Sequence, residues 1–127
     1  MANNTEDELL ALTLRLLDSI VQGDWAAYSE LCDESLTAIE PESHGQLVTG
    51  LAFHKFYFDI GLSASRQQAT ICAPHVRVMN DVAVVAYTRL TQKLDATGSP
   101  VTQAVAETRV WQRKQGQWKQ VHFHRSA

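Results

Sequence analysis

Three arginines, Arg89, Arg109 and Arg125, occur in segments where β-branched and aromatic residues alternate with polar ones, a pattern typical of strands. Residues two apart in a strand share a face. Arg89 is therefore expected beside Tyr87, and Arg109 beside Trp111. A buried guanidinium without a partner is costly, so the sequence predicts an anionic partner for these arginines.

That partner is either a ligand or a carboxylate of the chain itself. An arginine side chain presents a rigid fork that binds a carboxylate through paired hydrogen bonds, so the three arginines are candidates for an anion clamp. Glu40 and Glu107 are the glutamates that would instead neutralise them. The two alternatives are compatible, because Glu40 could pair with one arginine while the others face the opening of a cavity.

The histidines offer weaker candidates for chemistry. His54 is a possible acid or base, but no carboxylate–histidine pair is recognisable in the sequence to orient it, so a wall residue is favoured. His122 and His124 have a spacing that metal sites use, but no third ligand stands at a recognisable spacing, and no metal site is predicted. Their strand face is expected to carry Trp118 and Gln120 as well, opposite the arginines.

Composition bounds the classes of protein that remain. The chain has 127 residues, 45% of them hydrophobic, which predicts one domain over residues 1–127. A net charge of −3 provides no basic footprint for nucleic acid. No apolar run approaches the ~20 residues needed to cross a membrane, and Cys32 and Cys72 are expected as free thiols. These features favour a soluble, cytoplasmic protein without a cofactor.

Helices must dominate the first half of the chain. A capping box at Thr5–Glu8 precedes a broad leucine stripe that ends at Gly23. Asp24 is expected to cap a shorter helix over 25–32, and a short strand is expected over 36–40, followed by a polar loop over 42–46. The third predicted helix, over 50–58, is rich in aromatic residues. Its expected inward residues are Leu51, Phe53, Phe56, Tyr57 and Ile60.

Four long strands follow, over 69–79, 82–94, 101–114 and 118–126. Pro74 predicts a bend, an edge or a bulge in the first of them. Helices followed by a long antiparallel sheet indicate an α+β fold. Strands of this length curl, and a curled sheet closed by helices forms a cone with a cavity.

The opposite face of the predicted sheet is apolar too. It carries Val82, Val84, Ala86, Leu90 and Val110. A sheet that is apolar on both faces is covered on both. Since the helices can cover only the concave side, the convex side is expected to meet another subunit.

Seven segments of the chain resemble the association (hub) domain of calcium/calmodulin-dependent protein kinase II, in order and from about Glu6 to the end. They are GDWAAY (23–28), LTAIEPE (36–42), GLAFHKFYF (50–58), PHVRV (74–78), AYTRLTQ (86–92), ETRVW (107–111) and VHFHRS (121–126). The resemblance implies the nuclear transport factor 2-like, or SnoaL-like, fold, an α+β cone with a strongly curved antiparallel sheet.

The resemblance also implies a function and a site. Association domains assemble subunits into rings, and the family's deep arginine-lined pocket accepts small carboxylates. Its matching residues here are His54, Arg89, Arg109 and Arg125, with Tyr28 nearby. The chain departs from the family at Thr49 and Leu62, which leaves the ligand preference open.

Other members of the superfamily are isomerases, dehydratases and polyketide cyclases, so an enzyme that uses the same cavity is the alternative. It would need a general base, for which Glu40, Glu107 and His54 are the candidates, and none has an evident activating neighbour. No catalytic residue is therefore predicted.

Kinase function has no support in the sequence. The chain contains no Gly-rich nucleotide loop and no catalytic His-Arg-Asp motif. It also lacks a basic amphipathic helix of the kind that calmodulin binds. The chain is expected to be a free-standing homo-oligomer that does not bind calmodulin.

Overall fold

A computed structural model describes residues 4–61 and 66–126, so Leu62 lies outside the described residues. The helices are α1 (Asn4–Gln22), α2 (Trp25–Leu31), the short 3-10 helix η1 (Pro41–Ser43) and α3 (Ala52–Asp59). The strands are β1 (Cys32–Ile39), β2 (Val48–Thr49), β3 (Gln67–Met79), β4 (Val82–Leu94), β5 (Pro100–Lys114) and β6 (Gln117–Arg125). The predicted α+β class is confirmed.

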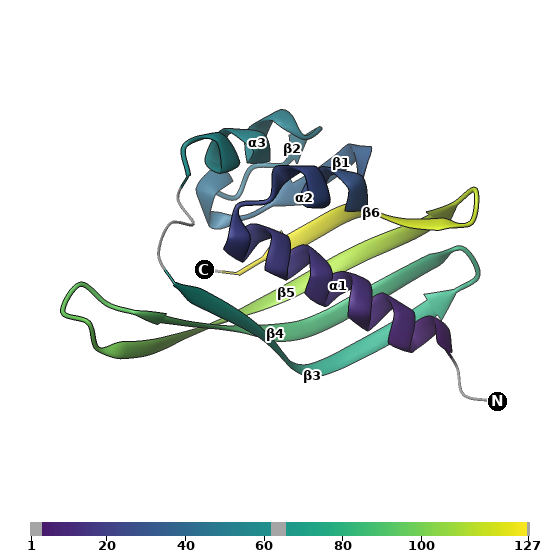
Figure 1. Ribbon diagram of the computed structural model, residues 1–127. Helices are drawn as coiled ribbons and strands as arrows, with labels where there is room; N and C mark the ends of the chain where they lie inside the picture. Colours follow the sequence, from purple (N-terminus) through teal and green to yellow (C-terminus); the bar gives the residue numbers. More distant parts are fainter. Residues whose placement is uncertain (1–3, 62–65, 127) are drawn as a thin grey trace.

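The leucine stripe of α1 packs on the concave face of the sheet (Figure 1). Leu9, Leu16 and Leu17 are fully buried there. The helix begins at Asn4, so Thr5 lies inside its first turn and the predicted cap at Thr5 is wrong. The predicted cap of α2 is confirmed, because the Asp24 side chain accepts a hydrogen bond from the Ala27 N–H at 3.1 Å.

The orientation of α3 differs from the prediction. Phe56 and Ile60 point outward, with 59% and 53% of their surface exposed, whereas His54 is buried. Residues three and four apart share a helix face, so the stripe that turns inward is His54, Tyr57 and Phe58. The most buried residue on the inward face of α3 is therefore a polar one, His54, and its partner is Glu40.

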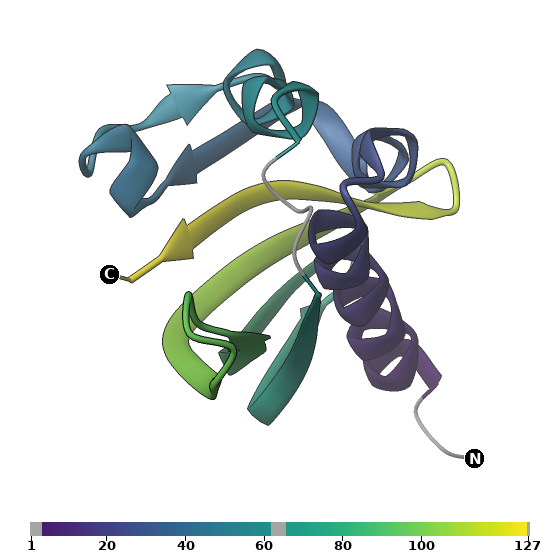
Figure 2. The same ribbon diagram turned by 60° about the vertical axis from the view of Figure 1, so that its left-hand side comes forward.

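The six strands form one curved sheet in the order β2-β1-β6-β5-β4-β3 (Figure 2). Neighbouring strands are antiparallel except for β1 and β6, which are parallel. This parallel pair was not predicted. It places Ile39 opposite His124, so the end of β1 lies beside the end of β6.

The strand pairs β1–β6, β3–β4 and β5–β6 each contain a register shift, and two of these bear on the predictions. The predicted irregularity at Pro74 is confirmed as a register shift between Cys72 and His75. The second was missed: Val110 pairs with His122 and Trp111 pairs with Gln120, so Val121 is an extra residue in β6. One extra residue reverses which face the following side chains occupy.

Because of this bulge, the predicted face of Trp118 and Gln120 is wrong. Trp118 and Gln120 are buried on the concave side, where they share the face of Trp111. They do not share a face with His122 and His124, as was predicted from uninterrupted alternation. Arg125, which follows the bulge, still lies on the concave side beside Phe123.

The convex side of the sheet is apolar at its centre. Val84 pairs directly with Val110, and Val82, Ala86 and Leu90 lie along the same face of β4. All five residues are half-buried. No helix within residues 4–61 and 66–126 packs against this side (Figures 1 and 2).

Of the helices described, none is long and apolar enough to span a membrane.

Candidate functional site

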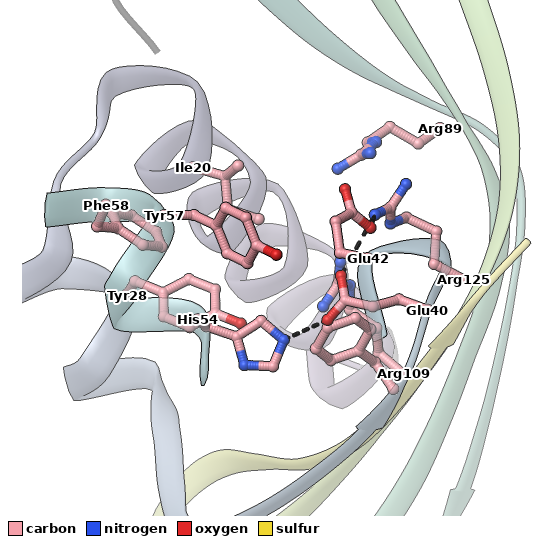
Figure 3. A pocket seen from close by; sticks show the side chains of 11 residues that line it. Ile20, Tyr28, Glu40, Glu42, His54, Tyr57, Phe58, Arg89, Arg109 and Arg125 are labelled. Carbon is pink, nitrogen blue, oxygen red and sulfur yellow. Dashed lines mark hydrogen bonds and ion pairs between the residues drawn. The ribbon is translucent and has the colours of Figure 1, made fainter. Parts of the chain in front are cut away.

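A cavity of about 180 Å³ lies between α3, the end of α1 and the concave face of the sheet (Figure 3). It is lined by Ile20, Tyr28, Glu40, Glu42, His54, Tyr57, Phe58, Arg89, Arg109, Phe123 and Arg125. All five predicted site residues, Tyr28, His54, Arg89, Arg109 and Arg125, are therefore brought to one cavity.

Arg109 forms the floor of the cavity and uses most of its donors within the protein. Only 1% of its surface is exposed. Its Nε donates to the Tyr87 hydroxyl at 2.8 Å, Nη1 to Gln120 Oε1 at 2.5 Å and Nη2 to Glu107 Oε1 at 3.1 Å. The guanidinium also lies 4.5 Å from the centre of the Phe123 ring. Arg109 is thus a structural cation whose charge is already compensated.

Glu107 compensates a second arginine as well. Arg89 Nη1 lies 3.3 Å from Glu107 Oε2, and the Arg89 side chain is 17% exposed. Within the described part of the chain, the buried Arg89 Nε has no hydrogen-bond partner. Arg89 therefore keeps one unused donor, in a buried position.

Glu40 joins the wall of the cavity to the third arginine. Its Oε2 is hydrogen-bonded to His54 Nε2, and its Oε1 lies 3.3 Å from Arg125 Nη2. The sequence showed no carboxylate partner for His54, and the structure supplies one in Glu40. The parallel pairing of β1 with β6 brings Glu40 beside Arg125, and α3 then places His54 over Glu40.

Glu42 is the residue that sequence reasoning missed. It was predicted in a polar loop, but its Oε1 contacts Arg125 Nη2. Its side chain is 42% exposed, in contrast to the buried Glu40 and Glu107. The spacing in Glu40-Pro41-Glu42 was a usable signal, because both carboxylates belong to one short turn.

Charges within the cavity balance without a ligand. Arg89, Arg109 and Arg125 are matched by Glu40, Glu42 and Glu107. Compensation by the chain's own glutamates, one of the two alternatives for the arginines, is therefore present. An added carboxylate needs one of these pairs to open.

A second hollow, of about 400 Å³, adjoins the cavity and shares Ile20, Glu42, Tyr57 and Phe58 with it. It extends to Gln67 and Lys93. The shared residues place Glu42 and two aromatic rings at the junction of the two spaces. A ligand longer than the inner cavity would continue past them.

The remaining candidate groups are not poised for chemistry. Gln120 Nε2 donates to Cys32 Sγ at 3.2 Å, and burial raises the pKa of the Cys32 thiol to about 11. The thiol therefore stays protonated at neutral pH. His122 Nδ1 is hydrogen-bonded to Thr37 Oγ1 at 2.7 Å. Throughout residues 4–61 and 66–126, no three His, Cys, Asp or Glu side chains are grouped so as to hold a metal ion.

The buried glutamates make stability dependent on acid pH. Burial opposes the charge of Glu107, but Arg109 and Arg89 outweigh it and lower the pKa of this carboxyl. Burial likewise opposes the charge of Glu40, and the lowering of its pKa comes from His54 and then Arg125. Groups with a lowered folded-state pKa stabilise the protein fully above their unfolded pKa, about 4.3 for glutamate, and lose this contribution as the pH falls through the folded value.

We therefore expect the free energy of unfolding to change little from neutral pH to about pH 5 and to fall below about pH 4. Urea unfolding across this range, at constant protein concentration, measures it. A free energy that stayed constant down to about pH 3 would show that the two carboxylates are not held by their cations.

Comparisons with known proteins agree with this architecture. The family model for the calcium/calmodulin dependent protein kinase II association domain matches residues 5–127. The delta subunit of calcium/calmodulin-dependent protein kinase type II from Oryctolagus cuniculus is 47% identical over 125 residues, which are 96% of this chain and 24% of that protein. The chain thus spans about a quarter of the length of this relative.

Solved structures give the same result. The association domain of C. elegans CaMKII has a TM-score of 0.93 at 42% identity, covering 98% of this chain and 96% of that chain. The CaMKII hub homology domain of Chlamydomonas reinhardtii has a TM-score of 0.90 at 45% identity, covering 96% and 97%. An NTF2-like protein from Novosphingobium aromaticivorans, at 19% identity and a TM-score of 0.80 over 95% and 80%, shares the fold. The predicted nuclear transport factor 2-like fold is confirmed.

Proposed function

The chain belongs to the family of calcium/calmodulin-dependent protein kinase II association domains, and from this premise we propose that it self-associates through the convex face of its sheet. Here the convex face means Val82, Val84, Ala86, Leu90 and Val110. The names of the two closely similar solved structures, an association domain and a hub homology domain, support assembly as the function of this fold unit.

The observation that carries the proposal is the apolar convex face. Val84 and Val110 pair at its centre, and polar side chains such as Arg77 and His122 pair with these two valines from the neighbouring strands. An apolar centre with a polar rim is the usual anatomy of a protein interface. The mass of the chain in solution tests this function: a dimer or larger particle supports it, and a monomer rejects it.

We propose a second function for the chain, which lies in the cavity: the binding of a small molecule that has a carboxylate and an apolar body. Arg89 and Arg125 line the cavity, and their side chains are 17% and 15% exposed. The walls include Tyr57, Phe58 and Phe123, so a bare inorganic anion would leave them without contacts. The aromatic surface and the cations together favour an amphipathic carboxylate.

Binding of such a compound is expected to raise the melting temperature, because a ligand that binds only the folded state stabilises it, by about 2.7 kcal/mol at one hundred times its Kd. The probe is 3-phenylpropanoate, with acetate as the comparison that lacks an apolar body. Arg125→Leu is expected to abolish the shift. Arg113→Leu is the matched control, since Arg113 forms an exposed ion pair with Asp81.

Thermal unfolding and calorimetric titration of the three proteins measure this. Equal shifts in the parent and Arg125→Leu proteins, or no shift in the parent, would remove the carboxylate site. Arg125→Leu also leaves Glu40 with His54 as its partner, so a loss of stability by itself does not decide the question.

The enzymatic alternative has less support. A carboxylate that acts as a general base near neutral pH usually needs a raised pKa, but the pKa values of Glu40 and Glu107 are both lowered. His54 is held by Glu40. That the chain binds no calmodulin, nucleic acid or membrane stays a prediction.

A further inference from the structure

We infer that Glu42 is an internal competitor for the cavity, an autoinhibitory carboxylate that occupies Arg125 until the carboxylate of a ligand displaces it. This inference rests on the proposed carboxylate-binding role of the cavity. It adds that Glu42 sets the affinity for the ligand and that the ligand carries a single carboxylate.

The three glutamates of the cavity differ in how firmly they are held. The Glu107 side chain is fully buried between Arg89 and Arg109. Glu40 is buried and has two partners, His54 and Arg125. The Glu42 side chain is 42% exposed, and in the described part of the chain it pairs with Arg125 alone. Exposed ion pairs contribute little, about 0–1 kcal/mol, so Glu42 is the carboxylate that leaves most easily.

The position of Glu42 would let its side chain move between the inner cavity and the outer hollow. It lines both the inner cavity and the outer hollow, and its carboxylate points toward Arg125 within the cavity (Figure 3). The backbone of η1 is fixed, because Ser43 Oγ accepts a hydrogen bond from the Glu40 N–H at 3.2 Å and donates to the Gln46 carbonyl at 2.8 Å. Opening therefore requires only rotation of the Glu42 side chain into the outer hollow.

Charge and donors favour the exchange of one carboxylate for another. When Glu42 leaves, three arginines face two glutamates, so the cavity has one positive charge in excess. A ligand with one carboxylate restores neutrality, whereas one with two carboxylates overshoots it. A ligand carboxylate placed between Arg125 and Arg89 would also meet the Arg89 guanidinium, which is 17% exposed and pairs with Glu107 at 3.3 Å.

Glu42→Gln is expected to bind 3-phenylpropanoate up to about fivefold more tightly than the parent chain, because in the parent the ligand must first displace an ion pair worth about 0–1 kcal/mol. Glu30→Gln is the matched control. Glu30 is also exposed and pairs with an arginine, Arg15, at 3.7 Å, but it does not line the cavity. The Kd of Glu30→Gln for 3-phenylpropanoate is expected to equal that of the parent.

The uncharged amide of the same probe separates charge from shape. We expect no gain in the affinity of Glu42→Gln for 3-phenylpropanamide, since the competing group acts through its charge. Glu42→Ala, which also removes the charge, is expected to show the same gain for the carboxylate. Calorimetry gives each Kd, and thermal unfolding of each variant without ligand verifies that it is folded.

The outcomes separate this inference from the role on which it rests. Tighter binding of the carboxylate by both Glu42 variants than by the parent supports the inference. Binding by the parent with an equal or larger Kd in both Glu42 variants would overturn the inference and leave the carboxylate site intact. Absence of binding to every protein would overturn both.

Discussion

Replacing Glu107 with glutamine is expected to lower the free energy of unfolding by about 3–5 kcal/mol, because it removes the counter-ion of buried cations. Glu107 is fully buried, Arg109 is 1% exposed and Arg89 is 17% exposed. A neutral amide retains the volume and can still accept from the Tyr87 hydroxyl, which now donates to Glu107 Oε1 at 2.5 Å. The loss therefore reports the charge rather than the shape.

Urea unfolding at a fixed protein concentration measures this loss. Asp81→Asn is the matched control, since Asp81 pairs with Arg113 at 3.0 Å in an exposed position, where an ion pair contributes about 0–1 kcal/mol. If Glu107→Gln cost no more than Asp81→Asn, Glu107 would not be the carboxylate that neutralises the buried arginines.

Alternation along the strands was sufficient to predict the concave face for all three arginines, although in β6 it misplaced two other residues. β4 and β5 run without a bulge between them, so Arg89 and Arg109 share the concave face as the period of two predicts. In β6 the same rule failed, because the extra residue Val121 reverses the side of Trp118 and Gln120. That bulge depends on the register between β6 and β5, which cannot be predicted from the sequence of β6 alone.

The partners of the arginines depended on topology. Glu40 reaches Arg125 only because β1 runs parallel to β6, whereas the sequence predicted an antiparallel sheet. His54 was expected at the cavity from the family resemblance, but its pairing with Glu40 was not. Five of the eight residues of α3 are aromatic or apolar, so periodicity alone left its inward face undetermined. The contact between His54 and Glu40 decides it.

The second large effect concerns assembly. Val84→Asp places a charge at the centre of the convex face, opposite Val110, and a buried charge without a partner is strongly unfavourable. The variant is expected to dissociate to monomers while its concave core remains unchanged. Gln103→Asp, at an exposed position of β5 outside the convex face, is the control that should assemble like the parent.

The solution mass of the unmodified chain tests the central claim most directly. Stable interfaces between identical subunits commonly bury on the order of 2,000 Å² or more, so assembly should persist on dilution. Light scattering at micromolar concentration is expected to give at least twice the 14.2 kDa of one chain. A mass of 14.2 kDa under these conditions would contradict self-association through the convex face.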